Sequence, residues 1–151
     1  MTDRSHEERN AADTARLKAL VARLSDEDLS RQTDGDWTIA AGLAHIAHWD
    51  RTVALRWAAA MAADTLPIGI PLEIGHVIND ASLPIWLAVP PRTATEIAVT
   101  AADETDAVLA ALPDAALDAA VAAGVPRVLD RSIHRNAHLD DLERALAGVS
   151  A

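Results

Sequence analysis

Apolar residues recur every three or four positions along most of the chain, which is the spacing of amphipathic helices. The clearest run predicts a long helix that begins after a Thr38 cap and ends near Asp64. Its expected core side joins Ile39, Leu43, Ile46, Asp50, Val53 and Trp57. Before it, Ser5-His6-Glu7-Glu8 has capping-box spacing and opens a first helix, and Ser25-Asp26-Glu27-Asp28 predicts a short helical turn.

Prolines and glycines divide the second half of the chain. The breaker-rich stretch 66–71 predicts a connection, followed by a helix from about Leu72 that Pro84 should kink or restart. Pro90-Pro91 stops that helix, and Thr93-Ala94-Thr95-Glu96 opens the next one. A short helical turn is expected within 113–124, and a last helix from near Val128 to Val149. Because strong strand alternation is missing, we predict one all-α domain over residues 1–151, a four-helix bundle with short extra helices in its connections.

Composition narrows the function classes. The formal net charge is −10 and Lys18 is the only lysine, which argues against a nucleic-acid partner, since phosphate binding needs clustered Lys and Arg. The chain has no cysteine and therefore neither a disulfide nor a thiol nucleophile of its own. The charged start does not resemble a signal peptide, and no run approaches the roughly 18 apolar residues of a membrane-spanning helix. We expect a cytoplasmic protein without membrane contact.

Histidines carry the strongest chemical signal. His134 and His138 are one helical turn apart in His134-Arg135-Asn136-Ala137-His138, and they extend the apolar seam of the last helix. His45 lies on the flank of the seam of the long helix. Three imidazoles from two helices suit one divalent metal ion, with a coordination position left open for chemistry. The alternative is a set of core-edge histidines that bond to backbone or water.

Other polar and aromatic residues near these seams have several interpretations. Asn79 shares with His76 the expected inward side of the helix that starts at Leu72, either as a substrate contact or as a tie between helices. Asp50 faces inward and either pairs with an arginine such as Arg131 or orients a ligating histidine. Trp49 either packs in the core or walls a pocket beside His45. His48 falls toward the opposite face, and His6 is expected to be exposed.

Two segments together resemble the DinB/YfiT-like superfamily. The segment Trp37-Thr38-Ile39-Ala40-Ala41-Gly42-Leu43-Ala44-His45-Ile46-Ala47 is similar to the family's W-[ST]…L-x-H-[LI]-A signature. The segment His134-Arg135-Asn136-Ala137-His138-Leu139-Asp140-Asp141-Leu142 is similar to its closing H-x-x-x-H-L-x-x-[IL]. The two segments look especially like those of relatives described as mycothiol-dependent maleylpyruvate isomerase, N-terminal domain. Asp50 departs from some relatives, which carry a histidine at that place.

The resemblance implies a four-helix bundle that binds a divalent metal, often zinc or nickel, through His45, His134 and His138. It also implies a homodimer and, for several relatives, a low-molecular-weight thiol cosubstrate. We therefore predict a metal-dependent enzyme acting on a small molecule, such as a mycothiol-type thiol transferase or isomerase. The alternative is a bundle that binds a small ligand or dimerises without catalysis. A fold shared by many functions does not by itself transfer a reaction.

Overall fold

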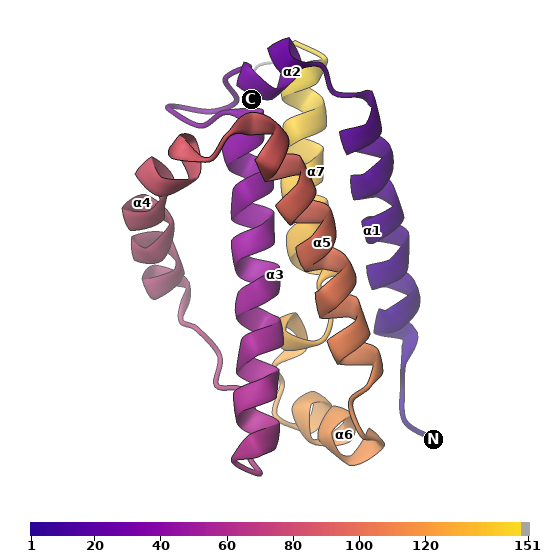
Figure 1. Cartoon of the computed structure of the whole chain (residues 1–151). Helices are drawn as coiled ribbons and strands as arrows, with labels where there is room; N and C mark the ends of the chain where they lie inside the picture. The colour runs from indigo at the N-terminus through magenta and orange to yellow at the C-terminus, as the bar shows by residue number, and fades with distance from the viewer. Residues whose placement is uncertain (149–151) are drawn as a thin grey trace.

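Four helices lie side by side in the computed structural model, which describes residues 1–148 (Figure 1). They are α1 (Ser5–Arg23), α3 (Ile39–Ala62), α5 (Pro91–Ala110) and α7 (Ser132–Leu146). Helices α1 and α3 each pack against both α5 and α7, so the four close around a common core. The connections hold α2 (Asp26–Ser30), α4 (Leu72–Ala88), α6 (Asp114–Ala122) and a 3-10 turn, Pro126–Val128. This architecture confirms the predicted all-α bundle.

Side-chain caps are present at the starts of α2 and α3, and the cap predicted at the start of α1 is absent. Thr38 Oγ1 accepts a hydrogen bond from the backbone N–H of Ala41, as the sequence predicts for the start of α3. Ser25 and Asp28 form the reciprocal capping box at the start of α2. The capping box predicted at Ser5 is wrong, because Ser5 is already helical and Arg4 occupies the cap position without a side-chain bond.

The later helix boundaries differ modestly from the sequence expectation. Helix α5 begins at Pro91 and not at Thr93, because the fixed φ of proline suits the first helical position. Helix α4 continues through Pro84 without a restart. The last helix begins at Ser132, since the stretch from Pro126 forms a separate 3-10 turn. Val149, the predicted end of that helix, lies outside the described residues.

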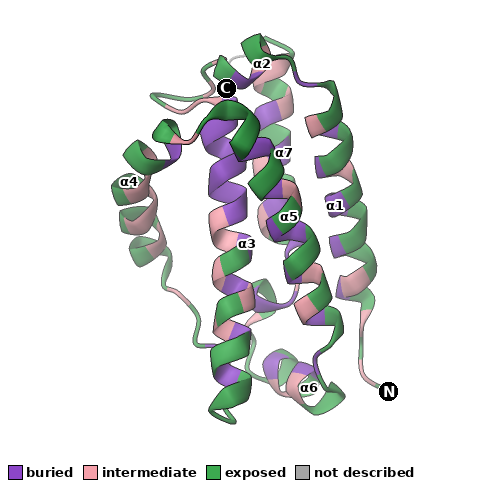
Figure 2. Cartoon of the chain, viewed as in Figure 1, coloured by how far each residue is buried: buried purple, intermediate pink, exposed green. Residues whose placement is uncertain are grey.

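Helix α3 is the most deeply buried element and positions the candidate site. All six residues of its predicted core side are buried, and residues 39–47 are buried on every side (Figure 2). At Gly42 the neighbouring helix comes close, because a Cβ there would lie 2.8 Å from Leu142 Cδ2 of α7. A glycine at this position therefore lets α7 approach α3 next to His45 and His138.

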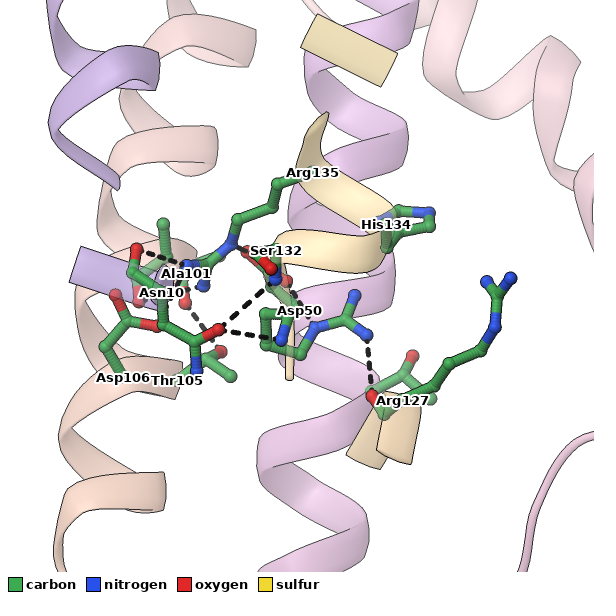
Figure 3. A network of polar contacts seen from close by, with 12 residues as sticks. Asn10, Asp50, Ala101, Thr105, Asp106, Arg127, Ser132, His134 and Arg135 are labelled. Carbon is green, nitrogen blue, oxygen red and sulfur yellow. Dashed lines mark hydrogen bonds and ion pairs between the residues drawn. The ribbon is translucent and has the colours of Figure 1, made fainter. Parts of the chain in front are cut away.

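A buried ionic network ties the four helices together near the middle of the bundle (Figure 3). Asp50 of α3 is fully buried, and its two oxygens accept from Arg131 Nε and Arg135 Nε, each at 2.8 Å. Arg135, also fully buried, donates to Thr14 of α1 at 2.9 Å and lies 2.9 Å from the Asp106 carboxylate of α5. One guanidinium thus links α1, α3, α5 and α7.

Helix α4 stands outside this square of helices, along the outer side of α3 (Figure 1). Within the described part of the chain, no helix combines the length and the apolar character needed to cross a membrane.

Candidate metal centre

Three imidazole rings from two helices meet at one point in the bundle. His45 projects from α3, and His134 and His138 project from successive turns of α7. His45 Nε2 lies 3.0 Å from His138 Nε2 and 3.2 Å from His134 Nε2. One ring nitrogen of each histidine lies within 4.8 Å of the others, and no other described group of such side chains is that closely spaced.

The spacing and the donor type fit a divalent metal ion. Zinc–imidazole bonds of about 2.0–2.1 Å in a tetrahedral site place two ligand nitrogens about 3.3 Å apart, close to the two observed separations. Three neutral nitrogen donors leave at least one coordination position without a protein ligand, which is typical of catalytic sites and not of closed structural ones. The cluster is therefore suited to a divalent ion.

Burial keeps these rings neutral, the form that binds metals. Burial lowers the pKa of His45 from 6.5 to about 3, with smaller contributions from the charges of His138, His48 and Arg131. Burial also lowers the pKa of His134 well below its ordinary range and lowers that of His138. Because a protonated imidazole has no free lone pair, the lowered pKa values make all three nitrogens available at neutral pH.

Aromatic packing orients the rings. The centroid of His45 lies 4.9 Å from that of Trp86 and 5.3 Å from that of Trp37, in both cases edge to face. Trp49 lies 6.4 Å from His45 and 6.5 Å from His134. The Nδ1 atoms of His45 and His134 are buried without a hydrogen-bond partner among the described residues, so packing and not a carboxylate holds these two rings.

The sequence leaves two interpretations open for each of Asp50 and Asn79. Their hydrogen-bond partners distinguish between these interpretations. Both Asp50 oxygens are taken by arginines, so Asp50 pairs with Arg131, as the sequence suggested, and does not orient a histidine. Asn79 Oδ1 accepts from Trp49 Nε1 at 2.9 Å, which ties α4 to α3 beside the site. Its amide nitrogen remains free to face a ligand, because Asn79 also lines the adjacent cavity.

The remaining histidines lie outside the cluster. His48 is half-buried and packs against Trp49 and Trp86, with ring centroids 5.4 Å apart in both pairs. The inward position predicted for His76 is wrong, because α4 lies outside the bundle and leaves His76 exposed. His6 is also contrary to expectation: it is 5% exposed, because α1 turns its first residues toward the loop that precedes α7.

An open cavity of about 560 Å³ leads to the histidines. Its walls include the ligand candidates His45 and His138, together with Gln32, Asp34, Trp37 and Asn79. This volume lies in the range of small-molecule sites. On the α7 side the lining includes Asp141 and Arg144, which form an ion pair with each other.

The contacts of Trp37 and Trp86 with His45 are not predicted from the sequence. The sequence also does not predict that residues 32–34, in the loop before α3, line the cavity. Trp37 directly precedes the Thr38 cap, but the cap bond from Ala41 to Thr38 does not fix the direction of the Trp37 side chain. Trp86 is seven residues after Asn79, on the same expected inward side of the helix from Leu72, so its spacing predicts its burial. Only the packing of α4 on α3 shows that it meets His45.

Comparison with known proteins identifies a family for this chain. The family model described as DinB superfamily matches residues 10–139. The chain belongs to the DinB superfamily. Neither the curated proteins nor the solved structures gave a match. The matched range includes His45, His134 and His138, so the DinB match covers all three residues of the histidine cluster.

Proposed function

We propose that this DinB-superfamily chain is a metal-dependent enzyme whose divalent ion, zinc or nickel, is held by His45, His134 and His138. The observation that carries the proposal is the convergence of three Nε2 atoms, two of them 3.0 and 3.2 Å from the third. Imidazoles packed this closely, and kept neutral by burial, are suited to a cation that accepts their lone pairs.

We further propose that the substrate is a small molecule and that a low-molecular-weight thiol of the mycothiol type is the cosubstrate, in a transferase or isomerase reaction. When bound, the ion supplies Lewis acidity that lowers the pKa of a thiol or water in contact with it. The absence of cysteine means that any thiol must come from outside the chain. The cavity of about 560 Å³ is large enough for such partners.

The chain's own residues contribute binding and orientation in this proposal. Trp37 and Trp86 hold His45 in place and exclude water from one side of the cluster. The Asn79 amide, fixed through its oxygen by Trp49, presents N–H donors to a substrate. The loop residues Gln32 and Asp34 add polar groups farther along the cavity.

Metal content is the first test. Purified wild-type protein should contain about one equivalent of metal by elemental analysis, and His45→Ala and His138→Ala should each lose it. His48→Ala is the matched control, because His48 lies beside the same tryptophans but outside the cluster. Unchanged metal content in both ligand variants, or equal loss in the control, contradicts the assignment.

Catalysis needs its own test. A panel of thiols assayed against electrophiles and maleylpyruvate should reveal turnover that depends on the metal and disappears in His138→Ala. Stoichiometric metal without turnover across the panel would instead favour a bundle that binds a small ligand without catalysis.

We also propose that the protein is a homodimer. The outer side of α4 exposes apolar side chains at helical spacing: Ile74 is 51%, Val77 64% and Ile85 67% exposed. Such a row is typical of a surface that a second copy covers. Light scattering after size exclusion should give a dimer mass for wild-type protein and a monomer mass for Val77→Glu, with Ala107→Glu on exposed α5 surface as control. A monomeric wild-type protein would contradict the proposal.

A further inference from the structure

The cavity that leads to the histidines differs in charge from one end to the other. Buried His45 and half-buried His138 line its inner end, where the proposed divalent ion would add positive charge. Its exposed entrance carries the charged residues Asp34, Asp141 and Arg144. Two carboxylates and one guanidinium leave the entrance with an excess of negative charge.

The guanidinium at the entrance is already paired. Arg144 Nη2 contacts the Asp141 carboxylate, and Arg144 Nε donates to the backbone carbonyl of Asp140 at 3.4 Å. No other arginine or lysine is among the described residues that line the cavity. The Asp34 carboxylate, in contrast, is exposed and has no ionic or hydrogen-bonding partner in the described part of the chain. The entrance therefore offers an unpaired carboxylate and no unpaired cation.

Asp34 shares a tight turn with Trp37, and both residues line the cavity. The backbone N–H of Trp37 donates to the carbonyl of Asp34 at 3.1 Å, and Gly35 supplies the positive φ of 56° within the turn. The N–H of Thr33 donates to the carbonyl of Trp37 at 2.9 Å. These bonds hold the backbone of the loop, so the carboxylate and the indole stay on the same cavity wall.

Trp37 connects this wall to the histidines, because its ring centroid lies 5.3 Å from that of His45. A carboxylate close to an indole suits an organic cation, since ion pairing and cation–π attraction act together. Arg31 Nη1 donates to the carbonyl of Leu146 at 2.9 Å and ties the loop to the end of α7. The C-terminal end of a helix carries partial negative charge, which also favours a cation at the entrance.

We propose that Asp34 and Trp37 form a subsite for an ammonium group at one end of the substrate, whose other end reaches the histidines. This inference rests on the proposed metal-dependent function, because the bound ion holds the inner end of the molecule. The substrate class is then a small molecule with a metal-binding group, such as a thiol, at one end and a cation at the other. A molecule with anionic groups at both ends fits less well, because one of them would face Asp34.

Three thiols that differ only at their far end test the subsite: 6-aminohexanethiol, 6-mercaptohexanol and 6-mercaptohexanoate. Each is titrated into zinc-loaded protein by calorimetry. The amine should bind tightest and the acid weakest, with affinities about fivefold apart, as expected for an exposed charge pair. The difference should shrink when the salt concentration is raised to about 0.5 M, because salt screens exposed charges.

Asp34→Asn should remove the preference for the amine over the acid without changing affinity for the neutral alcohol. Asp36→Asn is the matched control, because Asp36 is exposed in the same loop but does not line the cavity. It should keep the wild-type preference. Both positions are exposed, so thermal unfolding of the two variants should match that of the wild type.

The outcomes separate the subsite from the function on which it rests. Binding of all three thiols with equal affinity, an unchanged preference in Asp34→Asn, or equal loss of preference in Asp36→Asn would overturn the subsite alone. Zinc-loaded protein that binds none of the three thiols would contradict the proposed thiol-dependent function, and the subsite with it.

Discussion

Replacing Asp50 by asparagine tests how much the fold depends on its buried ionic network. The side chains have nearly the same size, so Asp50→Asn changes charge and hydrogen bonding without opening a cavity. In the wild type both carboxylate oxygens accept from arginine Nε atoms at 2.8 Å, and Asp50 and Arg135 are fully buried. In the variant the amide nitrogen is a donor that faces another donor, and two guanidinium groups lose their shared counter-charge.

The expected loss follows from the burial of all three partners. Removing one member of a buried ion pair destabilises a protein by about 3–5 kcal/mol, because it leaves an uncompensated charge in the interior. A domain of this size is stable by only about 5–15 kcal/mol, so the variant should lose at least a fifth of its stability. Arg135 also bonds to α1 and contacts α5, so the loss should be felt by every helix of the square.

Urea unfolding followed by far-ultraviolet circular dichroism measures this free energy. The control is Asp103→Asn, which removes a carboxylate paired with Lys18 at 2.7 Å where both side chains are about half exposed. Exposed pairs contribute about 0–1 kcal/mol, so the control should stay close to the wild type. If Asp50→Asn lies within about 1 kcal/mol of the wild type, the reasoning about unpaired buried charge is wrong.

Three further variants test other parts of the structure. Gly42→Ala should weaken metal binding, because its Cβ would lie 2.8 Å from Leu142 Cδ2 and displace that side chain beside His138. Adding Leu142→Ala should restore affinity in a metal titration, and no rescue would contradict this. Asn79→Leu removes the acceptor of Trp49 Nε1, so it should lower the free energy of unfolding by about 1 kcal/mol and speed amide hydrogen exchange in α4. Unchanged exchange would show that this bond does not hold α4. Burial lowers the pKa of His6, so below pH 6.5 the unfolded chain binds a proton that the folded chain does not, and stability falls as the pH drops. His6 contributes at most about 1.4 kcal/mol per pH unit to this fall, alongside the buried His45, His134 and His138, so His6→Gln should reduce the slope by that one share in urea titrations, and an unchanged slope would contradict this.

Local patterns in the sequence predicted much of the bundle. The three- and four-residue spacing from Ile39 to Trp57 placed the buried side of α3 correctly, because a helix inside a bundle must bury one stripe. Thr38 and Ser25 predicted their caps, since a cap depends on residues three apart. The same reasoning failed at Ser5, where the chain is already helical, so local spacing alone does not fix a boundary.

Tertiary placement was harder to predict than local structure. His76 has the right spacing for an inward position on α4, but α4 lies outside the square of helices, which no local pattern reveals. Arg135 lies between His134 and His138 in the sequence, and a charged residue there is expected at the surface. It is fully buried, because Asp50, Asp106 and Thr14 contact it from three other helices. The spacing of His45, His134 and His138 suggested a shared ion, but only the packing of α3 on α7 brings their rings together.

The approach of α3 to α7 is fixed on both sides of the histidines, by Gly42 against Leu142 and by the Asp50–Arg135 ion pair. We therefore expect the chain to fold without an ion as a template. A chelator should remove bound metal from the protein without unfolding it, and the metal-free protein should bind zinc or nickel again in vitro. For the proposed metal-dependent enzyme, the identity of the bound metal in a cell would then be decided by supply and exchange after folding, and not at the moment of synthesis.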